Sequence, residues 1–287
     1  MRAATALIAL TLVPITAASA EIARARYLMG TVCEIAVDGD AKQIDAAFAE
    51  AARIERMLST WRDDSELVRV NRGQAASPEL RGLLDSVIAW RERTGGAFEP
   101  QVRPLIDAWR TRADGALPSH DAIEGALASI RSGRAAFEEG GFGKGYALDR
   151  MLSVVDAPRA MINFGGQIAV RGDYRVAIAD PEQRDVATVN VTLRDASLST
   201  SSGSEKSFVV NGRRFTHIID PRTGEALPPR GSVSVIARDA LTADVLSTAL
   251  YVMGPDEGLR WANAHGVAAL FITSSHQIVR SNDFPKD

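Results

Sequence analysis

Cysteine is nearly absent from this chain of 287 residues, which contains only one, Cys33. A lone cysteine has no partner for an internal disulfide, so a small scaffold held together by disulfides is excluded. We expect Cys33 to serve as a small apolar residue in a strand. With 46% hydrophobic residues, the chain is long enough to be stabilised by a hydrophobic core instead.

An excess of positive charge is lacking as well. The formal net charge is -3, and no run of Lys and Arg concentrates positive charge locally. Binding to nucleic acid or to anionic lipid depends on such charge. The composition therefore argues against a nucleic acid partner.

The N-terminal apolar stretch, residues 6–15, is shorter than the roughly 20 residues that cross a bilayer, and Pro14 interrupts it. Arg2 is the only charge among the first twenty residues, and Ala18-Ser19-Ala20 ends them. This is the pattern of a cleaved secretory signal, and it is less typical of a membrane anchor or a first buried helix. We expect the mature protein to begin at Glu21.

The chain is thus predicted to consist of a signal peptide, residues 1–20, and one catalytic unit, residues 21–287. No repeat, low-complexity tract or linker divides the second part. Cys33 lies about a dozen residues beyond the cleavage site, so it cannot be the lipidated first residue of a lipoprotein. We expect a periplasmic protein without a stable membrane span.

Apolar residues recur at helical spacing from Ile44 to Leu58, in a segment free of Gly and Pro. A second helix is predicted to begin at Ser77-Pro78, as N-cap and first helical position, and to end at Gly95-Gly96. Further helices are predicted from Tyr146 to about Val155, from near Thr242 to Gly254-Pro255, and around Trp261.

The segment 27–37 (YLMGTVCEIAV) predicts a strand, and from Met161 short β-rich runs follow one another. Asn211-Gly212 is the clearest hairpin turn, because both central residues of a type I′ turn need positive φ. The runs ALFIT and QIVRS predict a closing hairpin. Since helices and strands are mixed without regular βαβ alternation, we predict an α+β fold with a largely antiparallel sheet and packed helices.

The sequence GGFGKG at 140–145 offers a phosphate-binding loop. Glycines just before a helix leave N–H groups open to an anion at the positive end of the helix dipole, and Lys144 adds a charge. The motif matches neither a P-loop nor a dinucleotide fingerprint, since Gly145 follows the GK pair. A glycine-rich turn with a solvated lysine is the alternative interpretation.

Asp244 and Thr248 stand four residues apart at the start of the last long helix, so their oxygens share one face. A carboxylate and a hydroxyl suit Mg²⁺, which takes oxygen ligands and completes its shell with water and substrate phosphates. Alternatively, Asp244 only favours the helix dipole and Thr248 is merely packed. As an exposed first-turn acid, Asp244 is expected to contribute little to stability.

His217, one of four histidines, lies in a predicted strand that runs into the turn of HIIDPRTG, 217–224. Asp220-Pro221 and Gly224 are typical turn residues. A histidine beside such a turn is either a hydrogen-bonded structural residue or a group that transfers protons.

Seven motifs in order resemble the ApbE family of FAD:protein FMN transferases. They span nearly the whole predicted mature chain, and the resemblance implies a single ApbE-like, T-fold-like catalytic unit. The motifs are Met29-Gly-Thr, TWRDDSELVRVN at 60–71, GGAFEP at 95–100, GGFGKGYALD at 140–149, NFGG at 163–166, HIIDPRTG at 217–224 and TADVLSTAL at 242–250.

In that family FAD is bound with Mg²⁺ at its pyrophosphate, and the FMN half is transferred to a Thr or Ser hydroxyl of a partner protein with release of AMP. The resemblance implies Asp244, Thr248 and a backbone carbonyl of the 140–143 loop near Gly141 as metal ligands. It implies that His217 assists deprotonation of the attacking hydroxyl. FAD contacts are implied for Met29, Trp61, Ala97, Phe98, Glu99, Glu138, Lys144 and Ile218.

The chain departs from the family pattern at Glu99 and Glu138, where Asp is more common, and at SSGSEK, 201–206, which lacks an aromatic residue. Three activities share the implied site. They are flavinylation of membrane redox subunits such as those of Rnf- or Nqr-type complexes, hydrolysis of FAD to FMN and AMP, and flavin binding without turnover. They differ in what attacks the flavin nucleotide: an acceptor hydroxyl, water, or nothing.

Overall fold

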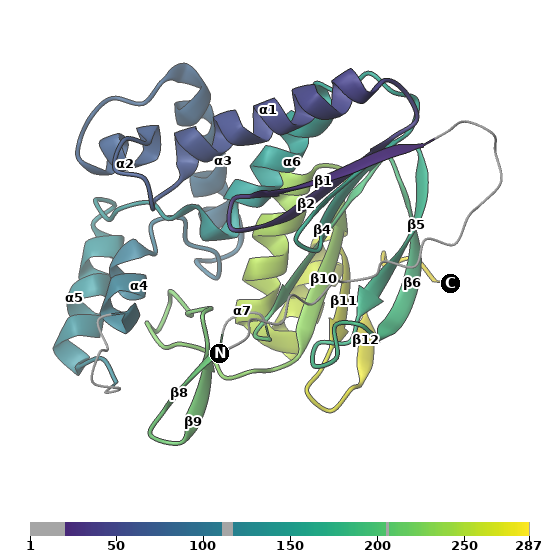
Figure 1. Ribbon diagram of the computed structural model, residues 1–287. Coiled ribbons are helices and arrows are strands. Elements are labelled where there is room, and N and C mark those ends of the chain that lie inside the picture. Colours follow the sequence, from purple (N-terminus) through teal and green to yellow (C-terminus); the bar gives the residue numbers. More distant parts are fainter. Residues whose placement is uncertain (1–20, 111–116, 205–206, 287) are drawn as a thin grey trace, which may run out of the picture.

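A single eight-stranded sheet forms the centre of the computed structural model, which describes residues 21–110, 117–204 and 207–286 (Figure 1). Every neighbouring pair of strands in this sheet is antiparallel, which confirms the predicted α+β fold. The predicted signal peptide lies outside the described residues. In spatial order the strands are β1 (Ile22–Leu28), β2 (Thr31–Val37), β3 (Ala160–Phe164), β4 (Gln167–Arg171), β7 (Ser197–Ser202), β10 (Ser232–Ala237), β11 (Ala268–Ile272) and β12 (Ile278–Arg280).

The strands of this sheet are packed against α1 (Ala41–Leu58), α6 (Gly143–Ser153) and α7 (Ala240–His265). The remaining helices are α2 (Glu66–Asn71), α3 (Pro78–Arg93), α4 (Arg103–Arg110), α5 (His120–Arg131) and the short 3₁₀ turn η1 (Glu139–Gly141). Two separate ribbons complete the fold, β5 (Asp173–Ala179) with β6 (Ala187–Arg194), and β8 (Ser207–Val210) with β9 (Arg213–Thr216). No helix in the described ranges is long and apolar enough to cross a membrane.

The turn chemistry and caps in the sequence predict several elements correctly. The Ser77 hydroxyl accepts the N–H of Leu80 and caps α3, with Pro78 in the first position. Asn211 and Gly212 adopt φ of 49° and 75° and join β8 to β9 in a two-residue turn. The closing hairpin forms as β11 and β12.

The prediction of one strand over 27–37 is wrong, because the chain reverses at Met29-Gly30. These two residues adopt φ of 47° and 76°, and Leu28 pairs with Thr31 across the turn. A two-residue turn with positive φ at both positions joins neighbouring antiparallel strands, here β1 and β2. Methionine is an unusual residue for such a conformation, so the sequence does not signal the turn.

The helix predictions are confirmed at one boundary and need correction elsewhere. The predicted end at Gly254-Pro255 is a real break in α7, since Gly254 has φ of 78°, and a second helical stretch follows to His265 where the sequence predicts a short helix around Trp261. α6 begins at Gly143 and not at Tyr146. Helices α2, α4 and α5, with 6, 8 and 12 residues, are not among the predicted elements. The first two are short, but α5 carried a usable signal, because its buried residues Ile123, Ala126, Leu127 and Ile130 recur at helical spacing after the cap Ser119.

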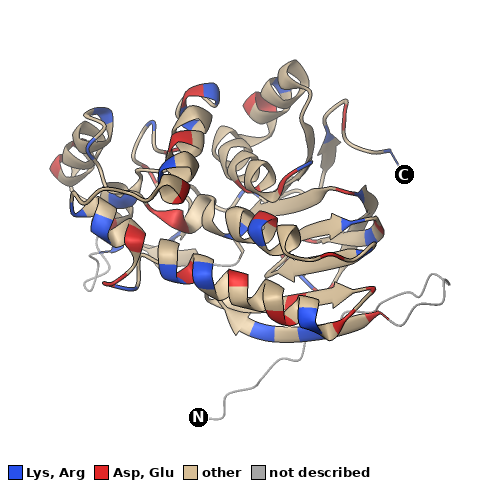
Figure 2. Ribbon diagram, turned by 90° about the horizontal axis from the view of Figure 1, so that it is seen from above, with Lys and Arg blue, Asp and Glu red and all other residues tan. Residues whose placement is uncertain are grey.

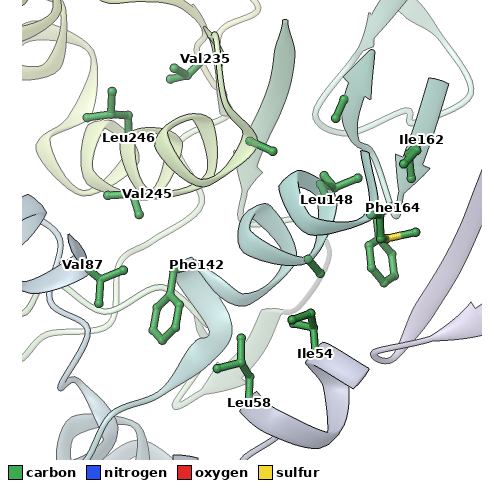
Figure 3. Packing of buried hydrophobic residues seen from close by; sticks show 14 of the residues in the cluster. Ile54, Leu58, Val87, Phe142, Leu148, Ile162, Phe164, Val235, Val245 and Leu246 are labelled. Atoms are coloured by element: carbon green, nitrogen blue, oxygen red, sulfur yellow. The ribbon is translucent and has the colours of Figure 1, made fainter. Parts of the chain in front are cut away.

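The main core lies between the sheet and helices α1, α3, α6 and α7. Figure 3 shows side chains from these elements meeting around Leu148 of α6 and Phe142, the residue that precedes α6. Cys33 belongs to this core with 0% exposure, as predicted, and burial raises the pKa of its thiol to about 12. Two smaller cores lie under the β5–β6 ribbon and between α4, α5 and the β8–β9 ribbon.

Charged residues follow the outer faces of the helices. Figure 2 shows positive and negative residues interspersed along them in that view. This distribution agrees with a net charge of -3.

Candidate functional site

The N-terminal turns of α6 and α7 are in direct contact. The carboxylate of Asp244 on α7 accepts the backbone N–H of Gly145, in the first turn of α6, at 2.9 Å. A Cβ atom on Gly145 would lie 2.5 Å from the carbonyl oxygen of Ala240 and 2.7 Å from the Cβ of Asp244. Only glycine permits so close an approach of the two helices. The last glycine of GGFGKG is therefore required for helix packing.

This contact brings the three implied metal ligands together. Thr248 lies one turn after Asp244, and its hydroxyl donates to the carbonyl oxygen of Asp244 at 3.2 Å. Because that bond uses the hydroxyl hydrogen, the oxygen keeps lone pairs that can accept a cation. A Cβ on Gly141 would lie 3.5 Å from the Thr248 hydroxyl oxygen, so the glycine-rich loop passes directly over Thr248.

Asp244 is buried, with 4% of its surface exposed, so the expectation of an exposed first-turn acid is wrong. Burial raises the pKa of its carboxyl group, while the charge of Lys144 and hydrogen bonds from Gly145 and Gln167 lower it. The helix packing that admits Gly145 is also what covers Asp244. A buried carboxylate is stabilised by a cation, so its burial and the two neighbouring oxygens fit a hard divalent ion such as Mg²⁺.

A buried polar layer lies beneath Asp244. The Gln167 amide donates to the hydroxyl of Ser199 at 2.7 Å, and Ser247 lies within hydrogen-bonding distance of both Ser199 and Ser201. Ser247 also donates to the carbonyl oxygen of Asp244 at 3.0 Å. Strands β4 and β7 thus hold the start of α7 from below. Residues 205–206 of the SSGSEK stretch lie outside the described ranges.

Two acids precede the glycine-rich loop and engage Thr60. The carboxylate of Glu139 accepts the Thr60 N–H at 3.1 Å, and Glu138 accepts its hydroxyl at 3.4 Å and the guanidinium of Arg103 at 3.2 Å. Burial, followed by the charge of Glu139, raises the pKa of Glu138 despite the nearby Arg103 and Arg110. The second oxygen of Glu139 is buried and has no hydrogen-bond partner within the described part of the chain.

The implied FAD contacts at Met29, Phe98 and Lys144 surround the same loop. Lys144 is partly buried in the first turn of α6, where its charge acts on Asp244. The Met29 side chain would lie 3.8 Å from a Cβ on Gly143, and the Phe98 ring 3.1 Å from one on Gly141. The hairpin tip of β1–β2 therefore lies next to Gly143, and the segment after α3 lies next to Gly141.

Ala97 and Glu99 are buried beside Phe98. One carboxylate oxygen of Glu99 accepts the N–H of Gln101 at 2.9 Å, and the other lies 3.6 Å from the guanidinium of Arg91. Burial raises the pKa of Glu99. Its carboxylate is thus engaged by Gln101 and by Arg91 of α3, which makes Glu99 a support for the segment at Phe98.

Trp61 is 79% exposed, in contrast to these buried residues. The guanidinium of Arg110 lies 4.9 Å from the centre of its ring, in a cation–π contact. The preceding residue, Thr60, is tied to both acids of the glycine-rich loop. Trp61 therefore presents a large flat apolar surface to solvent next to this loop.

His217 does not lie within a strand, contrary to prediction, because β9 ends at Thr216. Its side chain is exposed. Thr216 is hydrogen-bonded to Tyr251, which lies on α7 one turn after Thr248. The following residue, Ile218, is half-buried against the main core, and its carbonyl oxygen accepts the N–H of Leu227 at 2.9 Å. His217 is thus anchored on both sides, near the same stretch of α7.

No group of three or more His, Cys, Asp or Glu side chains suited to a metal occurs among residues 21–110, 117–204 and 207–286. The implied site contains one carboxylate, so it depends on hydroxyl, backbone and substrate oxygens. A cavity of about 430 Å³ lies elsewhere, between α5 and β9, lined by residues such as Trp109, Ile123 and Phe215. None of the implied site residues lines it.

Sequence reasoning missed Arg103, Glu139, Gln167 and Asp149, which the structure places around the site. Arg103 and Glu139 belong to segments for which no helix was predicted, so no face could be assigned to them. Asp149 carried a usable signal: it lies four residues after Gly145 on one helix face, next to the buried Leu148. An acid on the buried side of a helix indicates a specific partner.

An α+β fold in which a buried carboxylate, a hydroxyl and a glycine-rich helix N-terminus converge is suited to holding a cation beside phosphate. The chain belongs to the ApbE family, whose sequence model matches residues 29–271. It is 30% identical over 307 residues to the FAD:protein FMN transferase of Treponema pallidum, covering 88% of this chain and 84% of that protein.

Solved structures agree with this membership. The ApbE protein of Thermotoga maritima superposes with a TM-score of 0.83 at 27% identity and covers 91% of this chain and 97% of its own. The apo flavinyl transferase ApbE of Pseudomonas stutzeri gives a TM-score of 0.81 at 25% identity, covering 92% and 95%. The single-unit architecture predicted from the motifs is therefore that of the family.

Proposed function

We propose that this chain is an Mg²⁺-dependent FAD:protein FMN transferase. The observation that carries the proposal is the convergence of Asp244, Thr248 and Gly141 where α6 meets α7. The name shared by curated relatives supports the reaction. The acceptor would be a Thr or Ser hydroxyl of a target protein, with subunits of Rnf- or Nqr-type membrane redox complexes as the leading candidates.

In this reaction the protein must align the acceptor hydroxyl with the FMN phosphorus and neutralise the negative charge that develops on the phosphates. In the proposed reaction the acceptor oxygen forms a bond to the FMN phosphorus, the bond from that phosphorus to the bridging oxygen breaks, and AMP leaves with that oxygen. Mg²⁺ held by Asp244, Thr248 and the Gly141 carbonyl would stabilise the charge that builds up on the phosphates. Lys144 adds a positive charge at the same helix end.

The acceptor hydroxyl must lose its proton during this step. We propose that His217 accepts this proton. Its exposed side chain is accessible to a protein partner, and its neighbours Thr216 and Ile218 are held in place by hydrogen bonds. General-base assistance of this kind contributes roughly 10²–10⁴-fold to rates. Met29, Ile218 and Trp61 would supply apolar surface to FAD. Phe98 is only 2% exposed, so it would support the loop around FAD together with Ala97, Glu99 and Glu138.

Hydrolysis of FAD to FMN and AMP is the rival activity, because water could attack the same phosphorus. Flavin binding without turnover is the third possibility. The decisive experiment incubates purified protein with FAD and Mg²⁺, with and without a Thr-containing peptide from a candidate redox subunit. Covalent flavin fluorescence on the peptide, with one AMP released per flavin, supports transfer. AMP release without peptide indicates hydrolysis, and neither product indicates binding alone.

We also propose that the protein acts in the periplasm after removal of residues 1–20. The apolar stretch from residue 6 to 15 and the Ala18-Ser19-Ala20 triplet support this location. Mass spectrometry of protein recovered from the periplasmic fraction should show Glu21 as the first residue. An intact N-terminus in the cytoplasmic fraction would contradict this location.

A further inference from the structure

Asp149 of α6 is joined to the start of α7 by two hydrogen bonds. Its carboxylate accepts the backbone N–H of Ala240 at 2.7 Å and that of Leu241 at 2.9 Å, although these residues are 91 and 92 positions away. Ala240 and Leu241 are the first two residues of α7. The first N–H groups of a helix have no partner within it, so an acid from another helix satisfies them here.

The contact is reciprocal. Asp149 of α6 binds the first N–H groups of α7, and Asp244 of α7 binds the N–H of Gly145 in the first turn of α6. Gly145 and Asp149 are four residues apart and lie on one face of α6. The two helix ends are thus linked by a carboxylate from each side, with Gly145 packed against Ala240 between them.

The position of Asp244 relative to the glycine-rich loop depends on this junction. Asp244 and Thr248 are carried by α7, whereas Gly141 and Lys144 belong to the segment that opens α6. A shift of the start of α7 away from α6 would separate the two halves of the ligand set. The ordinary cap of α7, Asp239, binds the N–H of Thr242 at 2.8 Å but belongs to the chain leading into α7 and does not connect the two helices.

We propose that Asp149 is a positioning residue for the metal site, which holds Asp244 and Thr248 in register with the 141–145 loop. Both of its carboxylate oxygens accept N–H groups of α7, so we do not assign it as a metal ligand. The inference rests on the proposed function only in taking Asp244 as a metal ligand. Asp149 differs from Asp239 because Asp239 caps the same helix without bridging to α6.

The test compares Asp149→Asn and Asp149→Ala with Asp239→Ala as a matched control. Asparagine keeps one acceptor oxygen but points an NH₂ group at the second N–H, whereas alanine keeps none. Mn²⁺ affinity, measured by electron paramagnetic resonance titration in the presence of FAD, should fall about 10-fold or more for Asp149→Asn. It should fall further for Asp149→Ala and remain at the wild-type value for Asp239→Ala. Saturating Mn²⁺ should restore much of the lost turnover of Asp149→Asn.

Wild-type Mn²⁺ affinity in folded Asp149→Asn, or an equal loss in Asp239→Ala, would overturn the inference. Hydrogen exchange of the 140–148 segment in metal-free protein provides an independent measurement. It should become faster in Asp149→Asn and not in Asp239→Ala, because Asp149 bridges α6 to α7, whereas Asp239 bonds only within the start of α7. If wild-type protein bound no Mn²⁺, the proposed function would fail; unchanged exchange in Asp149→Asn would overturn the positioning role itself.

Discussion

Asp244 accepts a hydrogen bond from the backbone of Gly145 at 2.9 Å, across 99 positions of sequence and with no space for a side chain between the two helices. Two features of the implied metal site depend on this contact. The glycine-rich loop reaches Thr248 only because α6 packs so closely on α7, and Asp244 is buried by the same packing.

Replacement of Gly145 by alanine should force the helices apart. The added methyl group would lie 2.5 Å from the Ala240 carbonyl oxygen. We expect a loss of about 1–3 kcal/mol in the free energy of unfolding from overpacking, partly offset by the better helix propensity of alanine. Metal-dependent activity should fall much more than stability.

Gly140→Ala is the matched control, because a Cβ there meets no atom within 4 Å. Thermal unfolding and AMP release should be measured for both variants. Equal changes in thermal unfolding and in AMP release for the two variants would contradict the role assigned to the Gly145 contact.

Asp244→Asn should abolish the response to Mg²⁺ while the fold persists. The amide oxygen can still accept the Gly145 N–H. The variant also removes a buried carboxyl group whose pKa is raised by burial. We therefore expect metal-free unfolding free energy within about 1 kcal/mol of wild type, or above it. In wild type, Mg²⁺ with FAD should raise the melting temperature, since a ligand at 100 times its Kd stabilises by about 2.7 kcal/mol.

The melting temperature of Asp244→Asn should not respond to added Mg²⁺. Full wild-type activity in Mg²⁺ would show that Asp244 is not a metal ligand. Asp239→Asn is the control, since this acid lies at the same helix end but is exposed.

His217→Ala should slow flavin transfer by roughly 10²–10⁴-fold and leave FAD affinity close to wild type. The side chain is exposed, so stability should change by no more than about 0.5 kcal/mol. Transfer rates and FAD titrations measure the two effects separately. His120→Ala, another exposed histidine, should change neither; an equal loss of binding and rate in His217→Ala would assign it a structural role.

The metal-free protein should become more stable as pH falls through about 6, the pKa of Asp149 in the folded protein. Burial, together with the charges of Asp239 and Asp244, raises the pKa of Asp149 to about 6, against the two N–H groups that lower it. Between its ordinary value of 3.8 and about 6, the folded protein holds a proton that the unfolded chain has released. Stability is therefore lost as pH rises through this window, by at most about 3 kcal/mol.

Glu99, Glu138 and Asp244 contribute in the same direction, since burial raises each pKa. Hydrogen bonds from Arg53 lower the pKa of Glu50 and of Glu79, and these two acids act in the opposite direction as pH falls below their ordinary value of 4.5. Chemical denaturation at a series of pH values in EDTA should show the slope, and Asp149→Asn should flatten it. A wild-type stability that rises with pH across this window would contradict the expected titration.

Sequence alone determined what depends on short stretches of chain. Asn211-Gly212 predicts its turn because both residues tolerate positive φ, and Ser77-Pro78 predicts a helix start because the cap and the missing N–H act locally. Asp244 and Thr248 share a face because four residues make one helical turn. The ordered motifs sufficed to predict the family.

Tertiary structure alone decided how deeply these residues lie and which of them meet. The turn at Met29-Gly30, the burial of Asp244 and the bonds from Asp149 to the start of α7 all depend on contacts with distant segments. The i, i+4 spacing of Asp244 and Thr248 holds for any helix, exposed or buried. It became a candidate cation site only because Gly145 allows a second helix to cover it.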